Sequence, residues 1–301
     1  MPTEPLDLDA YKRRLGPYGA WLGLAFVTGA EAKAAAREVE AMGFGGLWIP
    51  ESPTGKEVLT LAAHVLDATN RLLIGTGIAT IWARDPVSAK CGAANLSEAS
   101  GSRFILGLGV SHGPIVERRG HVYEKPLTLM KRYLDGMDAT KYRGPLDERP
   151  PVVIAALRPK SLELARDRTD GSHTYFVPAE HTRRVRAVLG PTALLTPEIA
   201  VVLDENPETA RATAREYAKT YLALPNYANT LRDLGYSEDD LVDGGSDALI
   251  DAVIPWGNAD TIAAAAAEHI AAGADHVSIQ PIAETLGEKL TQLATIRAAL
   301  G

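Results

Sequence analysis

Short apolar runs alternate with alanine-rich stretches of helical spacing along the whole chain. Apolar runs of about four to eight residues are typical of buried strands, whereas apolar positions that recur every three or four residues are typical of helices on a core. The runs that predict strands are 21–26, 46–49, 71–78, 103–108, 151–155, 171–176, 197–203 and 276–279. The stretches that predict helices are 31–42, 58–68, 86–97, 127–137, 161–167, 179–189, 208–222, 261–272 and 286–300.

Strands that alternate with helices in this way predict an eight-stranded parallel (β/α) TIM barrel, with a doubly wound open sheet as the alternative. No Ser- and Gly-rich linker divides the chain, so we expect a single domain over residues 1–301. Two stretches interrupt the alternation, at about 111–125 after the fourth strand and about 225–255 after the seventh. Long excursions of this kind usually form the walls or lids of a binding site.

Composition and charge narrow the class of protein. Hydrophobic residues make up 46% of the chain and charged residues 23%, as in globular proteins. The net charge of −7 argues against a nucleic acid or an anionic membrane as partner. The single cysteine, Cys91, excludes a disulfide framework, and no metal-ligand cluster is visible, so we expect no metal. With neither a signal-peptide pattern nor an apolar run of membrane-spanning length, the expected location is the cytoplasm.

The reacting groups of a parallel barrel gather at the carboxyl ends of its strands. The residues at or just after the predicted strand ends are Phe26, Glu51, Ser52, Gly77, Ile78, Thr80, Trp82, Gly109, Ser111, His112, Ala156, Leu157, Arg158, His173, Tyr175, Trp256 and Gln280. This set is rich in glycine, aromatic rings and hydroxyls, and it contains no nucleophile elbow and no Walker loop. It favours a flat aromatic cofactor that brings its own reactivity.

The segment 71–109, RLLIGTGIATIWARDPVSAKCGAANLSEASGSRFILGLG, resembles the central signature of the bacterial luciferase-like oxidoreductases. The shared features are the GTG strand, an Arg-x-Pro helix start, and an Arg-Phe pair followed by LGLG. The segments WIPES, ADHVS and DGS also match, and the stretch around LPNY resembles actinobacterial members that use coenzyme F-420. The resemblance implies hydride transfer between F-420, favoured over FMN, and a small organic substrate, and we expect a homodimer.

The resemblance also implies roles for individual residues. The third strand would end in a bulge whose cis peptide, Gly77–Ile78, supports the back of the cofactor ring, with the Thr80 hydroxyl near that ring. The phosphate would lie at the helix after the fifth strand, although the paired glycines that members often carry there are absent. The further residues assigned to the cofactor are Ser52, Gly109, Ser111, Ala156, Leu157 and Arg158, and those assigned to the substrate pocket are Phe26, Trp82 and Trp256.

A proton must also be handled at the site, and Glu51 is the first candidate. Relatives of this kind carry an Asp at the position of Glu51 and a catalytic His at that of Ser52, so the histidine is lost here. His112 and His173 are the next candidates. Each of three residues also has a purely structural alternative. Glu51 would anchor the loop after its strand, and Gly77 would relieve crowding within the barrel. Arg158 would lie in solvent.

Three other functions stay open. With FMN, the same site would activate oxygen as a monooxygenase. Without a working acid or base, the protein would bind a flavin and not turn over. A phosphate-sugar lyase or isomerase would need a lysine or an acid–base pair at the strand ends, and no lysine lies there.

Overall fold

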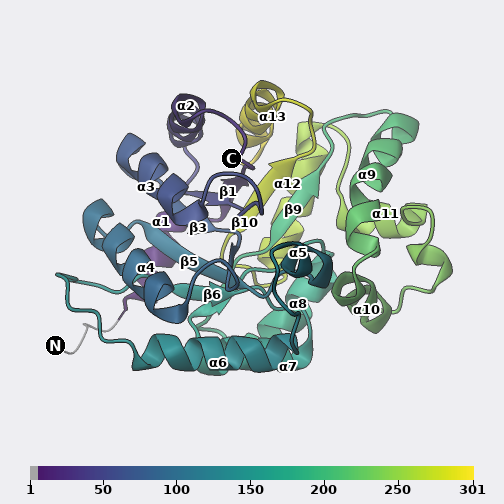
Figure 1. Cartoon of the computed structure of the whole chain (residues 1–301). Coiled ribbons are helices and arrows are strands. Elements are labelled where there is room, and N and C mark those ends of the chain that lie inside the picture. Colours follow the sequence, from purple (N-terminus) through teal and green to yellow (C-terminus); the bar gives the residue numbers. More distant parts are fainter. Residues whose placement is uncertain (1–5) are drawn as a thin grey trace.

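The computed structural model describes residues 6–301 and shows short parallel strands surrounded by helices (Figure 1). The strands are β1 Tyr18–Trp21, β2 Gly46–Ile49, β3 Leu73–Thr76, β4 Ala79–Thr80, β5 Phe104–Gly109, β6 Val152–Ile154, β7 Gly171–Ser172, β8 Leu194–Leu195, β9 Glu198–Val201 and β10 Val277–Pro281. The helices are α1 Leu8–Leu15, α2 Gly29–Ala41, α3 Val58–Ala68, α4 Pro86–Ser100, α5 Gly113–Arg118, α6 Pro126–Ala139, α7 Pro159–Arg168, α8 Ala179–Leu189, α9 Pro207–Leu222, α10 Pro225–Leu234, α11 Asp247–Val253, α12 Ala259–Ala271 and α13 Leu286–Ala299, with a 3-10 turn, η1, over Asp239–Leu241.

The sheet has ten strands in the order β8-β7-β6-β5-β3-β2-β1-β10-β9, with β4 beside β5. Every pairing is parallel, and the order follows the sequence with β10 next to β1. This is the order of a barrel, because a doubly wound sheet reverses direction at a switch point. The parallel α/β barrel architecture is therefore confirmed, and the doubly wound alternative is wrong.

Two short strands lie outside the eight predicted runs, which is why the sheet has ten strands: β4 follows the run 71–78, and β8 precedes the run 197–203. β3 and β4 are separated by Gly77 and Ile78, and β8 and β9 by Thr196 and Pro197. Pro197 has no N–H to donate to a neighbouring strand, so it favours such a break. Because β8 and β9 are consecutive in the chain yet stand at the two ends of the sheet order, this break lies where the two ends of the sheet meet.

The first predicted strand is misplaced. β1 pairs with its neighbours over Tyr18–Trp21, whereas the predicted range was 21–26. Leu22 and Leu24 are fully buried in the layer between sheet and helices without forming a strand. The apolar pattern after Trp21 therefore reflects burial of these side chains and not pairing with a neighbouring strand.

The sheet has two apolar layers, and a helix that the pattern did not predict closes the inner one. The larger core lies between the sheet and the outer helices. The inner core contains Trp48 and Leu73 together with Tyr11 and Leu15 of α1. Asp7 caps α1 by accepting from the Ala10 N–H. A Cβ added at Gly45, just before β2, would come 2.0 Å from the Leu15 carbonyl oxygen, so α1 lies against the amino end of the sheet.

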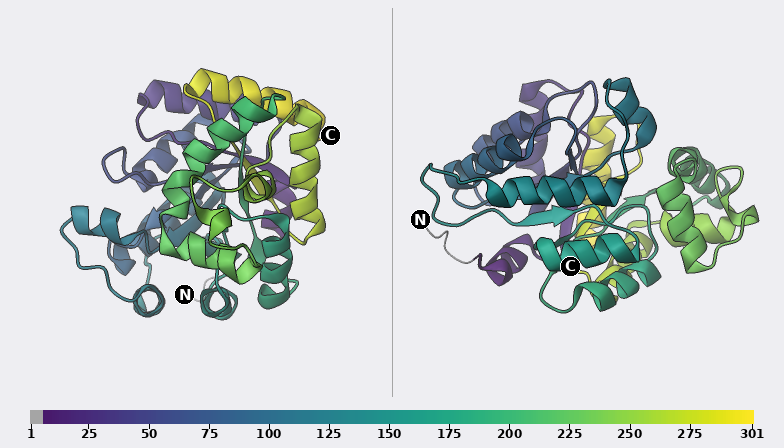
Figure 2. Two further views of the ribbon diagram at one scale, coloured as in Figure 1. Left: turned by 90° about the vertical axis from the view of Figure 1, so that its right-hand side faces the viewer. Right: turned by 60° about the horizontal axis from the view of Figure 1, so that its bottom comes forward.

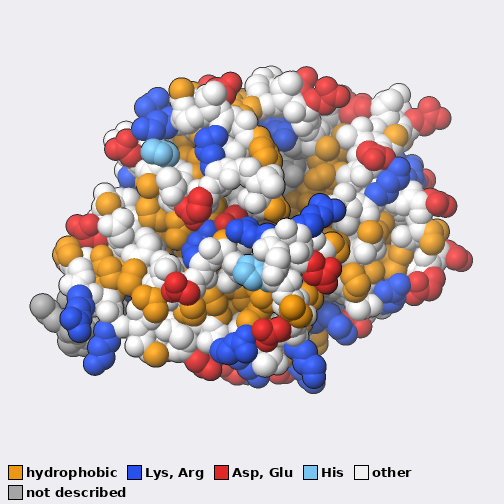
Figure 3. Space-filling model, viewed as in Figure 1, with side chains coloured by type: hydrophobic (Ala, Val, Ile, Leu, Met, Phe, Trp, Pro, Cys, Tyr) orange, Lys and Arg blue, Asp and Glu red, His pale blue; other side chains and the backbone are white. Residues whose placement is uncertain are grey.

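The helices α9–α11 and η1 form a separate layer at the opposite end. In the left view of Figure 2 the green α9–α11 helices lie in front of the strands, and the other helices surround the sheet. Residues 225–255, the second stretch that interrupts the predicted alternation, form α10, η1 and α11, and they pack on α9 through their own apolar cluster. Figure 3 shows a recess between this layer and the barrel. Among residues 6–301, no helix combines the length and apolarity that a membrane crossing requires.

Candidate cofactor and active site

A bulge lies at the carboxyl end of β3, and the peptide between Gly77 and Ile78 is cis, as the resemblance implies. The Gly77 N–H donates to the Ile49 carbonyl at 2.9 Å, and the Ile78 carbonyl accepts from the Glu51 N–H at 3.1 Å. A Cβ added at Gly109 would meet the Ile78 side chain at 2.5 Å, so only glycine fits there on β5. The bulge is therefore fixed by the two strands that flank it.

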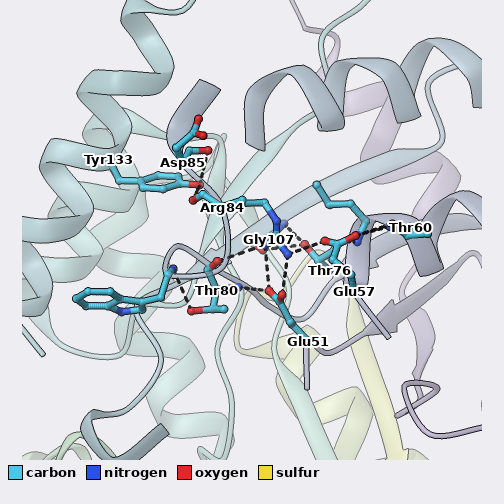
Figure 4. A network of polar contacts seen from close by, with 11 residues as sticks. Glu51, Glu57, Thr60, Thr76, Thr80, Arg84, Asp85, Gly107 and Tyr133 are labelled. Atoms are coloured by element: carbon cyan, nitrogen blue, oxygen red, sulfur yellow. Dashed lines mark hydrogen bonds and ion pairs between the residues drawn. The ribbon is translucent and has the colours of Figure 1, made fainter. Parts of the chain in front are cut away.

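Glu51 and Arg84 form a buried ion pair behind this bulge (Figure 4). The two guanidinium nitrogens of Arg84 lie 2.6 and 3.0 Å from the two Glu51 oxygens, and the Thr80 N–H donates to the same carboxylate at 2.7 Å. The side chains of Glu51 and Arg84 are only 4% and 8% exposed. Arg84 also binds Glu57 at 2.6 Å. Since both Glu51 oxygens are occupied, the geometry favours a role in positioning the bulge over proton transfer.

Two buried ring nitrogens beneath the bulge have no hydrogen-bond partner among the described residues. These are Trp21 Nε1 and His173 Nε2. A Cβ added at Gly77 would lie 3.0 Å from each of them, so both border the bulge. Buried polar atoms without partners are rare in proteins and often mark a ligand site. The residues at this position therefore fit a flat cofactor with polar edges.

His173 is held in one orientation by its surroundings. Its Nδ1 lies 2.7 Å from the Thr196 carbonyl, so Nδ1–H donates and Nε2 keeps its lone pair. The ring stacks on Trp48 with centroids 4.5 Å apart. Burial lowers the pKa of His173 to about 4, which keeps the imidazole neutral near pH 7. His173 can accept a hydrogen bond there, but it is a poor proton donor.

Arg158 lies at the start of α7, where the resemblance places a phosphate. Its Nε donates to Asp233 of α10 at 3.1 Å, and both side chains are about half exposed. The neighbouring Leu157 carbonyl accepts from His181 Nε2 at 2.8 Å, while Ala156 is buried. The structure thus places the expected helix start beside α10 and gives Arg158 an acidic partner.

The remaining predicted residues are not all brought together. Trp82 lies beside the bulge and donates from Nε1 to the Val110 carbonyl at 2.8 Å. Trp256 instead donates to Asp251 at 2.7 Å and lies under the Arg211 guanidinium, within the α9–α11 layer. Phe26 is 74% exposed and contributes to the surface of the loop after β1.

Ser111 and His112, on the loop after β5, have different neighbours. The His112 ring packs 5.7 Å from Tyr227, and burial lowers its pKa. Ser111 has a φ of 57° and accepts at its carbonyl from Tyr123 at 3.3 Å. Ser52 follows Glu51 directly after β2. The structure therefore places these residues after β2 and β5, at the carboxyl end of the barrel strands.

A cluster of phenol groups at this end was not predicted. The Tyr175 hydroxyl, after β7, bonds to Tyr217 and, at 2.9 Å, to Tyr221, both on α9. Gln280 Oε1 of β10 lies 2.9 Å from the Tyr175 hydroxyl and 3.2 Å from the Tyr217 hydroxyl, and it accepts from whichever of the two does not donate to the other phenol. Tyr175 and Gln280 stand at predicted strand ends. The available signal for the other two was their spacing of four residues, which puts both tyrosines on one helix face.

The parallel barrel and the cis-peptide bulge after β3 agree with what the resemblance to the luciferase-like class implies. The profile of the luciferase-like monooxygenase family matches residues 16–276, so the chain belongs to this family.

The curated relatives match between a third and a half of the chain. The 5,10-methylenetetrahydromethanopterin reductase of Methanolobus tindarius is 29% identical over 154 residues, which cover 45% of this chain and 47% of that protein. A putative coenzyme F420-dependent oxidoreductase of Mycobacterium tuberculosis, Rv3520c, is 35% identical over 97 residues, covering 32% of this chain and 28% of the relative. The matched part thus spans less than half the length of these relatives.

Solved structures share the fold at low sequence identity. An F420-dependent secondary alcohol dehydrogenase, solved with an F420-acetone adduct, superposes with a TM-score of 0.72 at 13% identity, covering 95% of this chain and 99% of the other. The EDTA monooxygenase of Chelativorans sp. BNC1 superposes with a TM-score of 0.73 at 13% identity, covering 95% and 93%. The fold is therefore shared by an F420-dependent dehydrogenase and by a monooxygenase.

Proposed function

We propose that this protein is an oxidoreductase that binds coenzyme F-420 and transfers a hydride to or from a small organic substrate, as a homodimer of single-domain chains. The observation that carries the proposal is the pair of orphaned nitrogens, Trp21 Nε1 and His173 Nε2, at the Gly77 bulge. The likeness to a relative described as F420-dependent supports F-420 over FMN.

The chain's own residues would bind and orient the cofactor. When bound, the deazaflavin supplies the hydride. The ion pair of Glu51 with Arg84 fixes the bulge through the Thr80 N–H, and His173 offers a lone pair beneath it. Arg158 at the start of α7 would receive the phosphate, exchanging its Asp233 partner for it.

FMN with monooxygenase chemistry is the second candidate. It is favoured by a structural neighbour, the oxygenating constituent of 3,6-diketocamphane monooxygenase from Pseudomonas putida in complex with FMN, which has a TM-score of 0.68. The bulge would support either ring, so the cofactor decides the reaction class: a deazaflavin carries hydride, whereas a reduced flavin also activates oxygen.

Titration calorimetry of the ligand-free protein with each cofactor tests the proposal. We expect F-420 to bind with a dissociation constant in the micromolar range or below, about −8 kcal/mol, and more tightly than FMN. Arg158→Ala should weaken F-420 binding. The control is Lys219→Ala, an exposed residue of α9, which should leave F-420 binding unchanged. Tight FMN binding with no detectable F-420 binding would reject the proposal, and oxygen consumption with FMN would then support the monooxygenase.

A further inference from the structure

Glu198 points into the interior of the barrel from the start of β9. It pairs with Ser278 of β10, and Ala200 pairs with Gln280, so these residues lie on one face of the sheet. The alternate residue, Ile199, belongs to the outer core against the helices. Glu198 is fully buried, and neither of its carboxyl oxygens has a hydrogen-bond partner among the described residues.

The groups that face Glu198 carry no positive charge. They are the Tyr175 phenol after β7, those of Tyr217 and Tyr221 on α9, that of Tyr227 on α10, and the Phe176 backbone N–H, which meets no hydrogen-bond geometry to the carboxyl. No ion pair to Glu198 occurs within residues 6–301. A buried carboxyl in such surroundings takes up a proton, and burial accordingly raises the pKa of Glu198 well above its ordinary value.

The phenol cluster connects this interior to the bulge. Tyr175 is the hub, since its hydroxyl contacts both α9 tyrosines and Gln280. Its ring lies 5.9 Å from that of Trp21, whose indole nitrogen borders Gly77. The hub is partly exposed, whereas Glu198 is not. Tyr175 therefore contacts Trp21 on one side and Gln280 on the other, and the β9 partner of Gln280, Ala200, is two residues from Glu198 on the same face of the sheet.

We propose that Glu198 is a stored proton and that the Tyr175 hub delivers it to the oxygen of an uncharged carbonyl substrate during reduction. This inference rests on the proposed function, whose reduced deazaflavin supplies the hydride. The hydride forms the new C–H bond, the carbonyl π pair moves to oxygen, and the Tyr175 O–H bond breaks as the substrate O–H bond forms. A proton from Glu198 then restores the phenol through a water bound at the orphaned oxygens, leaving Glu198 ionised until solvent protonates it again. Tyr175 is the catalytic residue, and Glu198 acts through it.

Infrared spectroscopy of the ligand-free protein tests the stored proton without any cofactor. We expect a protonated-carboxyl C=O band at pH 7 that disappears in Glu198→Gln. It should remain in the matched control Glu216→Gln, whose side chain is exposed on α9 and pairs with Lys219. Thermal unfolding of each variant shows whether it has folded. If folded Glu198→Gln loses no such band, Glu198 is ionised and the inference is overturned.

Steady-state kinetics of the F-420-loaded protein tests delivery. Tyr175→Phe should lower kcat by ~10²-fold with little change in KM. Glu198→Gln should lower kcat less and abolish the fall in rate at high pH. An unchanged pH profile in Glu198→Gln would overturn the relay even if the infrared band is present. Absence of F-420 binding to the wild type, with the band intact, would reject the proposed function and leave the stored proton supported.

Discussion

The Glu51 carboxylate accepts charged hydrogen bonds from Arg84 and one bond from the Thr80 backbone. Its position at the end of β2 is also where a proton donor or acceptor would be expected. What separates the two roles is the partner. A carboxylate that binds a guanidinium through both oxygens, with a side chain only 4% exposed, is held in place and is not open to a substrate.

Glu51→Gln should therefore destabilise the protein and weaken cofactor binding. Removing one member of a buried ion pair leaves Arg84 partly unpaired, at a cost of about 3–5 kcal/mol. Urea denaturation and cofactor titration measure the two effects. The matched control is Glu57→Gln, because Glu57 binds the same guanidinium with a side chain that is 46% exposed, and its loss of stability should be smaller. Intact affinity together with a ~10²-fold loss of kcat would instead show that Glu51 transfers a proton.

At the scale of elements, α1 closes the amino end of the barrel. Tyr11 and Leu15 are buried against the inner face of the sheet, in contact with the cluster that contains Trp48. The helix has only two such positions in eight residues, and charged residues surround them. A local pattern this sparse does not predict a buried helix, although the helix completes the inner core.

Leu15→Ala should cost about 2–5 kcal/mol in the free energy of unfolding, because it leaves a cavity in a fully closed core. Leu8→Ala is the matched control on the same helix, since Leu8 is only partly buried and its loss should be clearly smaller. Urea denaturation with an unchanged m-value provides the comparison. Equal losses for the two variants would mean that α1 does not close the inner core in solution.

At the scale of the whole molecule, buried titratable groups shape the dependence of stability on pH. Burial lowers the pKa of His173, His269 and His276 to about 4. As pH falls, these histidines become protonated in the unfolded chain at about pH 6.5 and in the folded protein only at about pH 4. Stability is therefore lost as pH falls from about 6.5 towards 4. Burial raises the pKa of Glu198, which then keeps its proton in the folded state, so its contribution is lost as pH rises above about 4.5.

The free energy of unfolding should therefore be greatest near pH ~6.5. Between pH ~4.5 and ~6.5 these three histidines outweigh Glu198, and His112 and His181, whose pKa values burial also lowers, act in the same direction, so stability should rise with pH. Above pH ~6.5 only the opposing contribution of Glu198 remains among these groups, and stability should decline. Urea denaturation across this range measures the profile. In Glu198→Gln the free energy of unfolding should no longer decline above pH ~6.5. A wild-type free energy of unfolding that keeps rising to pH 9 would contradict the raised pKa of Glu198.

The sequence by itself determined the parallel α/β class and the positions of most helices, and the resemblance to a known family implied the bulge. Helical spacing and capping residues are local, so α3 and α8 have the predicted bounds, and the GTG segment carries the bulge at Gly77. The order of parallel strands followed from the alternation, because short connections through helices allow few other arrangements.

Only the tertiary structure decided which polar side chains meet. Arg84 reaches Glu51 across 33 residues, and Tyr175 reaches Tyr217 across 42. The partners of a side chain, and whether it is buried, depend on packing between distant elements, and no local pattern encodes them. This is why Glu51 looked like a proton carrier and Glu198 was not singled out, since burial and the absence of a cationic partner become visible only in the folded chain.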